Sequence, residues 1–508
     1  MNFEMNISRR WFIGGAASFG ALGAFGGCRI VDGRGFPASG APKLRFGVVS
    51  DIHVSYVGEG EGLLKHGNNQ IFRRTLEWFR DQKVDAVVIA GDMADHGIVE
   101  ELEAVAEAWY RVFPDDRLPN GNPVEKVFVY GNHDWHGWTW AKRILKKYPE
   151  GAERDRHILA KAYGAWWEKI FHEPYAPVYL KTIKGYPFVG QHWEPAPGED
   201  GCQFSRLGDF LKNRKTAIDP GLPFFYVQHP HLKDTCYGPW AWGHDRGDAT
   251  KTLSAFPNAI AFSGHSHYTL TDERSVWQGA FTSVGTSSLR YTGMPYNEHP
   301  PAGYENTTTE GKDSRRYNAE KMMGIFDRYD CCQGMLWDVY EDCIVAKRRE
   351  FVSGLDVGAA WVLPLPAAEP KPFAFAERAK KFNAPRFVDG GKIAVEPVRA
   401  KNRGGKGLKA VEKDAFKVTA PAAVADVNAR LYDLEFIVEA KDGARKSKLI
   451  IPEGFNHSVR HKKARATSFC IFAKDELPGT EVRFTAIPRN CFGKAGAAVC
   501  SEWMKVEV

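Results

Sequence analysis

Five short apolar runs in this chain each end in a cluster of Asp, His or Asn, and this repetition constrains the fold more than any other feature. An Asp after one strand is often only a helix N-cap, and a single His is often an ordinary core or surface residue. Capping does not explain five clusters in order, because His residues at i and i+2 cap nothing. The clusters read Ser50-Asp51-Ile52-His53, Gly91-Asp92-Met93-Ala94-Asp95, Gly131-Asn132-His133-Asp134, Gln228-His229-Pro230-His231 and Gly264-His265-Ser266-His267.

The apolar runs alternate with amphipathic helical patterns, which is typical of an α/β domain built in layers. Loops at the carboxyl ends of strands are where such domains build their sites. Apolar runs predict strands over 44–50, 84–90, 126–130, 187–192, 223–228, 259–263, 280–284, 334–340 and 344–351. Helical periodicity predicts helices over 70–82, 99–113, 140–147 and 157–171.

The residue types in the five clusters suit a divalent metal site. Imidazole, carboxylate and amide oxygen favour Zn, Fe or Mn, whereas Ca would require oxygen donors only. One carboxylate can bridge two ions, and about seven ligands are enough for two ions roughly 3.5–4 Å apart. The candidate ligands are Asp51, His53, Asp92, Asn132, His229, His265 and His267.

The motifs DxH, GDxxD, GNHD, a later His and GHxH resemble the signature of the calcineurin-like metallophosphoesterases. That superfamily includes purple acid phosphatases, Ser/Thr protein phosphatases and bacterial cyclic-nucleotide phosphodiesterases. The resemblance covers residues 43–355. It implies a four-layer αββα sandwich with a two-metal site at the sheet edge.

The resemblance also implies a role for each motif residue. His133 would be a His that faces the substrate without binding metal, and Asp134 would orient it. His231 and His96 lie beside ligands but match no ligand position. The implied metal sites are Asp51, His53 and His267 for the first ion, Asn132, His229 and His265 for the second, and Asp92 as the bridge.

The implied reaction is hydrolysis of a phosphate ester by a hydroxide that bridges two ions of Mn, Fe or Zn, with His133 as acid or charge stabiliser. Purple acid phosphatases carry a Tyr after the GD pair, where this chain has Asp95, and this chain also has the His of DxH. We therefore expect a phosphodiester substrate.

Two alternatives stay open. One is a phosphomonoesterase of nucleotides or sugar phosphates. The other, of a different class, is a non-catalytic, surface-anchored binding lipoprotein. A decayed site would have lost a ligand or His133, and none of these residues is missing.

Aromatic residues near the clusters are candidates for substrate binding. Their faces could stack a base or a sugar, and an arginine could clamp a phosphate. The competing interpretation is that the aromatic residues fill the core of a long insert. The candidates are Tyr237, Trp240, Trp242 and Arg290; Trp135, Trp138 and Trp140 follow GNHD and admit the same two interpretations.

The charge of the chain does not favour nucleic-acid binding. The 68 Lys and Arg exceed the 62 Asp and Glu by six, and no long block of like charge concentrates this excess. The expected partner is a small-molecule, lipid or nucleotide phosphoester, with no specific nucleic-acid binding.

Residues 1–28 resemble an export signal of the twin-arginine (Tat) type, because Arg9-Arg10 precedes an apolar pair and a Gly- and Ala-rich stretch. Small residues before Cys28 resemble a lipoprotein cleavage box, although Phe25 replaces the usual Leu. The alternative for Cys28 is an ordinary residue beside a signal-peptidase site. We expect an exported protein, periplasmic or anchored at the cell envelope through a lipidated Cys28, with 29–42 as a tether.

The C-terminal part differs in character. Residues 356–388 are rich in Ala, Pro and Lys and predict a linker, and 430–440 and 482–488 alternate like strands with one exposed face. The last strands resemble those of a fibronectin type III domain, which implies a β-sandwich over 389–508. Eight cysteines follow Cys28, and disulfides and free thiols both stay open.

Overall fold

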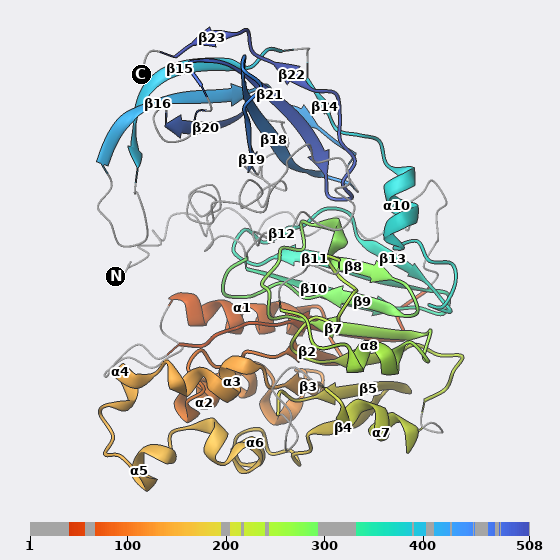
Figure 1. The fold of residues 1–508 in the computed structure, drawn as a ribbon. Helices are drawn as coiled ribbons and strands as arrows, with labels where there is room; N and C mark the ends of the chain where they lie inside the picture. The colour runs from red at the N-terminus through yellow and green to blue at the C-terminus, as the bar shows by residue number, and fades with distance from the viewer. Residues whose placement is uncertain are drawn as a thin grey trace.

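The chain forms an α/β part and a C-terminal part made of antiparallel strands, which lies above the first part in Figure 1. No helix in the ranges given below is long and apolar enough to cross a membrane. The computed structural model describes residues 40–55, 67–194, 204–214, 218–238, 243–292, 332–388, 391–402, 411–426, 429–450, 452, 466–472, 477 and 479–506.

The first sheet of the α/β part has the strand order β12-β11-β10-β1-β2-β3, with β13 paired to β11. β1, β2 and β3 are parallel, so their carboxyl ends lie at one edge. All strands predicted for this sheet are confirmed. Its strands are β1 (Leu44–Val49), β2 (Ala86–Ala90), β3 (Glu125–Val129), β10 (Gln333–Val339), β11 (Cys343–Glu350), β12 (Leu355–Asp356) and β13 (Trp361–Pro364).

The second sheet has the order β4-β5-β6-β7-β9-β8, and β5, β6, β7 and β9 are parallel. The sequence did not predict β4, which is only partly buried, or β8, which has three residues. Its strands are β4 (Val178–Ile183), β5 (Tyr186–Gln191), β6 (Phe224–Val227), β7 (Ala259–Ser263), β8 (Val276–Gln278) and β9 (Thr282–Gly285).

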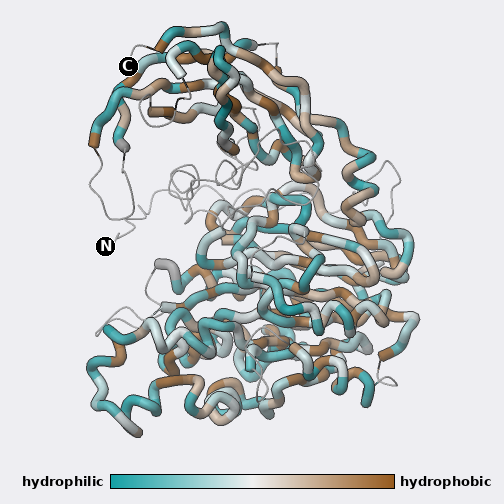
Figure 2. Tube along the Cα trace, viewed as in Figure 1, coloured by the Kyte–Doolittle hydropathy of each residue, from teal (hydrophilic) through white to brown (hydrophobic). Residues whose placement is uncertain are grey.

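The two sheets face each other across an apolar core. Phe46 of the first sheet packs on Phe188 and Phe225 of the second, with ring centroids 5.3 and 4.9 Å apart. In Figure 2 hydrophobic and hydrophilic stretches alternate along the chain, as expected for elements with one buried face.

Helices cover the outer faces of both sheets. Buried residues of α1, α2 and α6 share a core with the first sheet, and those of α7 and α8 share one with the second. This confirms the four-layer αββα architecture. The helices are α1 (Gly67–Asp81), α2 (Val99–Val112), α3 (Asn132–His136), α4 (Lys142–Leu145), α5 (Ala152–Asp155), α6 (Tyr163–Phe171), α7 (Arg206–Lys212) and α8 (Asp248–Leu253), with short 3-10 helices η3 (Pro114–Asp116), η4 (Gly137–Thr139), η5 (Leu159–Lys161) and η7 (Glu273–Ser275).

The C-terminal part contains a three-stranded sheet, β15-β16-β20, and a five-stranded sheet around β18 and β21. Apolar residues from both sheets share one core, as in a β-sandwich. The finer resemblance to a fibronectin type III domain stays a prediction. The strands are β14 (Arg386–Phe387), β15 (Ala394–Asn402), β16 (Val411–Ala420), β17 (Ala423–Val424), β18 (Leu431–Ala440), β19 (Arg445–Ile450), β20 (Thr467–Phe472), β21 (Glu481–Asn490), β22 (Val499–Cys500) and β23 (Met504–Lys505).

The linker predicted over 356–388 is wrong for much of its length. β13 pairs with β11 and extends the first sheet, and its Trp361 and Leu363 are buried. α10 (Phe375–Lys381) follows and packs on the β-sandwich through Phe375 and Ala379. The Ala- and Pro-rich composition hid these elements because each is only four to seven residues long.

A buried ion cluster lies where the two parts of the chain meet. The carboxylate of Glu273 accepts hydrogen bonds from Arg348 (2.9 Å) and Arg378 (3.0 Å). It also accepts one from the Trp361 indole N–H (3.1 Å). Arg378 belongs to α10 and stacks on Phe492 of the C-terminal part, 4.6 Å from the ring centroid. One carboxylate thus connects η7, β11, β13 and α10.

Candidate metal centre

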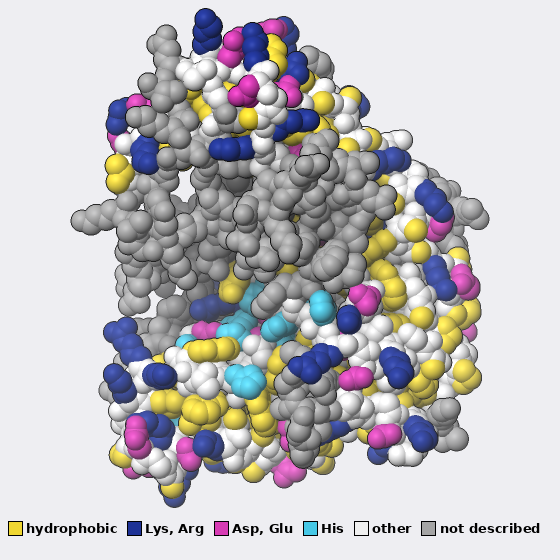
Figure 3. All heavy atoms as spheres, in the orientation of Figure 1, with side chains coloured by type: hydrophobic (Ala, Val, Ile, Leu, Met, Phe, Trp, Pro, Cys, Tyr) yellow, Lys and Arg dark blue, Asp and Glu magenta, His cyan; other side chains and the backbone are white. Residues whose placement is uncertain are grey.

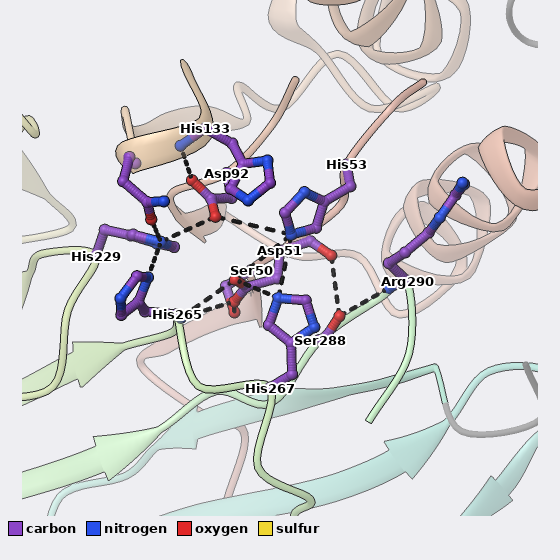
Figure 4. A network of polar contacts seen from close by, with 12 residues as sticks. Ser50, Asp51, His53, Asp92, His133, His229, His265, His267, Ser288 and Arg290 are labelled. Carbon is purple, nitrogen blue, oxygen red and sulfur yellow. Dashed lines mark hydrogen bonds and ion pairs between the residues drawn. The ribbon is translucent and has the colours of Figure 1, made fainter. Parts of the chain in front are cut away.

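The five predicted clusters meet at one edge of the α/β part, where β1, β2, β3, β6 and β7 end. Figure 4 shows the labelled Asp and His side chains of these loops pointing toward one another. On the face drawn in Figure 3, several His side chains lie close together at the surface.

One group of donor atoms consists of Asp51, His53 and His267. Asp51 Oδ1 lies 3.0 Å from His267 Nε2, and His53 Nε2 lies 3.1 Å from the same nitrogen. All three residues are buried, and their donor atoms are close enough to share one ion. The structure therefore brings together the residues predicted for the first ion.

A second group centres on Nε2 of His229. Asp92 Oδ2 and Asn132 Oδ1 lie 3.1 and 3.0 Å from it, and His265 Nδ1 lies 3.1 Å from it. Asp92 Oδ2 is also 3.7 Å from His53 Nε2, in the first group. The Asp92 carboxylate thus lies between the two groups, as a bridging ligand must.

Backbone carbonyls fix which ring nitrogen of two histidines carries the proton. Nδ1 of His229 donates to the Ala90 carbonyl (2.8 Å), and Nδ1 of His267 donates to the Tyr291 carbonyl (3.1 Å). Their Nε2 atoms therefore present lone pairs to carboxylate oxygens about 3 Å away. Acceptors that face acceptors in a buried site repel one another, and a cation between them removes this repulsion. The donor set fits two divalent ions.

The electrostatics around His229 also favour a positive charge. Burial lowers the pKa of His229, but the Asp92 carboxylate outweighs it and raises that pKa to about 9. Burial and the neighbouring His229 lower the pKa of His265 to about 3. Without a metal, a proton on His229 takes the place of the cation, so protons and metal ions compete for this position.

Five of the predicted ligands adopt left-handed backbone conformations, which cost energy for residues other than glycine. Tight turns after the strands direct the Asp51 and His53 side chains into the site. The φ angles are 51° for Asp51, 46° for His53, 52° for Asp92, 72° for His265 and 57° for His267.

Glycines leave room for the carboxylate ligands. A Cβ on Gly131 would overlap the Asp92 carboxylate, and one on Gly264 would overlap the Asp51 carboxylate. This explains physically why glycine precedes two of the clusters.

His133 lies at the rim of the centre, with its side chain 27% exposed. Its Nδ1 donates to the Asp95 carbonyl (2.7 Å), and its backbone N–H donates to Asp92 Oδ1 (2.8 Å). Its Nε2 is therefore the ring atom that can exchange a proton with a substrate. His133 also forms a possible donor group with His53 and Asp92, so the geometry admits a ligand role as well.

Asp134 does not orient His133 in the way the resemblance implies. Its buried carboxylate accepts the backbone N–H groups of Gly131 (2.7 Å), Ala94 (2.8 Å) and Met93 (3.3 Å). It thereby joins the loops after β2 and β3, and burial with the nearby Asp92 charge raises its pKa to about 7. Asp95 holds the His133 ring instead.

The predicted substrate residues lie in different environments, and not all of them belong to the described part of the chain. Tyr237 is only 2% exposed and packs against His231 and Tyr268, so a role in stacking substrate is wrong for it. Trp240 and Trp242 lie outside the described residues.

Arg290 lies beside the centre. Its backbone N–H donates to the Asp51 carbonyl (3.1 Å) and to Ser288 Oγ (2.9 Å). In Figure 4 its side chain runs past the ligands and away from them, and Nη1 has no hydrogen-bond partner among the described residues. Its role as a phosphate clamp stays a prediction.

His231 holds the loop that carries two ligands, a role that the sequence did not reveal. Its Nε2 bonds Ser266 Oγ (2.5 Å) and its Nδ1 bonds Ser263 Oγ (2.9 Å). Ser266 stands between His265 and His267. The only sequence signal was the position of His231 two residues after a ligand. Ser50, which donates to Asp51 Oδ2 (2.5 Å), gave no signal at all.

Replacing His231 by alanine is expected to weaken metal binding by about 10- to 100-fold, because the Ser266 loop loses its buried anchor. Isothermal titration of the metal-free protein with Mn²⁺ measures this. His157→Ala is the control, since His157 pairs with Glu100 (2.7 Å) and with none of the predicted ligands. Equal Mn²⁺ affinities in the wild type and His231→Ala would refute the positioning role.

Comparison with known proteins identifies one matching family model and several similar structures. The family model of the calcineurin-like phosphoesterases matches residues 44–268. A dimetal phosphatase from Danio rerio is similar over 64% of this chain and 99% of its own, with 12% identity and a TM-score of 0.34. A purple acid phosphatase from yellow lupin (Lupinus luteus) seeds is similar over 65% of this chain and 55% of its own, with 11% identity and a TM-score of 0.37. No curated protein matches the chain.

Proposed function

On the premise that residues 44–268 form a calcineurin-like phosphoesterase domain, we propose that this metal-dependent enzyme hydrolyses a phosphodiester at two divalent ions. One observation carries this proposal: Asp92 Oδ2 lies 3.1 Å from His229 Nε2 and 3.7 Å from His53 Nε2, and so belongs to both donor groups. Mixed imidazole and oxygen donors suit Mn, Fe or Zn.

Bound ions would neutralise the phosphoryl oxygens and make water a better nucleophile. The residues of the chain hold the ions and orient the proton donor. Because the Asp95 carbonyl accepts the Nδ1 proton, His133 offers Nε2 to the leaving oxygen. Burial lowers the pKa of His133, which makes its imidazolium a stronger acid for this transfer.

Support for a diester comes from the sequence. The His of the DxH motif, His53, and Asp95, which stands where purple acid phosphatases have Tyr, both favour the phosphodiesterase-like branch. Arg290 would clamp a substrate oxygen through its guanidinium.

The proposal places the enzyme outside the cytoplasm. It rests on the resemblance of residues 1–28 to a twin-arginine signal and of the region before Cys28 to a lipoprotein cleavage box. The substrate would then be a small-molecule, lipid or nucleotide phosphoester of the cell envelope or its surroundings.

Metal content and activity of the purified protein test the enzymatic part. We expect about two ions per chain after loading with Mn²⁺, and faster hydrolysis of bis-p-nitrophenyl phosphate than of p-nitrophenyl phosphate. Faster hydrolysis of p-nitrophenyl phosphate would indicate that the substrate is a phosphomonoester and not a phosphodiester. A chain that binds no metal under any loading condition would refute the proposal.

A further inference from the structure

A tryptophan lies exposed beside the proposed proton donor. Trp140 caps the carboxyl end of η4, and its backbone N–H donates to the Gly137 carbonyl (2.9 Å). The residue is 57% exposed. Its ring centroid is nevertheless only 4.8 Å from that of His133, with 57° between the ring planes.

The exposure of Trp140 contrasts with its neighbours. Trp135 and Trp138 on the same segment are partly buried and pack against apolar clusters. Trp503 of the C-terminal part is also exposed, but Arg483 and Lys441 lie over its ring, at 4.9 and 5.7 Å. Trp140 therefore presents a large apolar surface to solvent at the rim of the metal centre.

We propose that Trp140 is a stacking subsite for the base of a nucleotide substrate. The proposal rests on the proposed function, because it uses His133 as the proton donor. A leaving group departs on the side of the residue that protonates its oxygen, and the exposed ring of Trp140 is in contact with that residue. An indole face holds a nucleobase by stacking and tolerates different bases.

The charge of the segment fits the same substrate. Residues 135–147 contain no Asp or Glu, and the cations Lys142, Arg143, Lys146 and Lys147 are all exposed. Lys142 and Arg143 begin α4, directly after Trp140 and Ala141. An aromatic face next to positive charge recognises an anion that carries a base.

The test compares two ligands that differ only in the base. AMP and ribose 5-phosphate are titrated as competitive inhibitors of the Mn²⁺-loaded, full-length enzyme acting on bis-p-nitrophenyl phosphate. We expect the wild type to bind AMP about tenfold more tightly than ribose 5-phosphate, the size that stacking of one base provides. This preference should vanish in Trp140→Ala and persist in Trp140→Phe and in the control Trp503→Ala.

Several outcomes would overturn the subsite. Equal binding of both ligands by the wild type would do so, as would a preference for AMP that survives in Trp140→Ala. Weaker binding of both ligands by the same factor in Trp140→Ala would show that the ring only supports His133.

Failure of the proposed function looks different. A metal-loaded wild type that hydrolyses neither p-nitrophenyl ester would contradict the phosphoesterase assignment. Calorimetric titration of the same protein with AMP and ribose 5-phosphate would then test the base subsite without relying on activity, and tighter binding of AMP would support it.

Discussion

Replacing His133 by alanine is expected to lower kcat by about 10²- to 10⁴-fold while both metal ions stay bound. This range is typical for loss of a positioned acid or base. The reason is geometric: His133 is partly exposed and anchored by the Asp95 carbonyl, whereas the predicted ligands Asp51, His53 and His229 are buried. Elemental analysis and steady-state kinetics of one preparation measure both quantities. His136→Ala, on the same helix α3, is the control.

Replacing Asp92 by asparagine is expected to remove the metal ions as well as the activity, whereas His133→Ala keeps the ions. The reason is that Asp92 Oδ2 faces donors of both groups, and the substitution removes its charge. If His133→Ala emptied the centre instead, His133 would be a ligand, which its proximity to His53 and Asp92 also permits. If Asp92→Asn kept two ions, the bridging role would be wrong.

Replacing Glu273 by glutamine is expected to reduce the free energy of unfolding by about 3–5 kcal/mol, because it leaves buried arginines without a charged partner. Glu273 is 2% exposed, and Arg348 and Arg378 are 1% and 5% exposed. Burial alone would raise the pKa of Glu273, but Arg348 and the other arginines lower it. Its stabilising effect is therefore present above its ordinary pKa and is lost as the pH falls below that range.

Urea denaturation of the wild type and the variant measures this change. Glu377→Gln is the matched control, since Glu377 is 67% exposed and pairs with Lys380 on the surface of α10. We expect no measurable change for the control, as for most exposed ion pairs. A Glu273→Gln variant as stable as the wild type would show that the cluster does not hold β13 and α10 in place.

The sequence predicted the strands of the α/β part well because buried parallel strands are continuous apolar runs. It also predicted where the ligands lie, since carboxyl ends of parallel strands share an edge. It missed β4 and the short elements β8, β13 and α10, whose patterns are too brief or too mixed to stand out. The Ala- and Pro-rich stretch therefore looked like a linker.

The sequence alone determined the chemistry of the centre, because ligand types and their order along the chain are local properties. Only the tertiary structure decided which residues hold the side chains of the centre in place by hydrogen bonds. Asp134 follows His133 in the chain, yet it binds backbone N–H groups, and Asp95 from another loop holds the ring. Tyr237 turned out to be core and Trp140 exposed. Burial and hydrogen-bond partners depend on which distant segments pack together, and neighbours along the chain do not specify that.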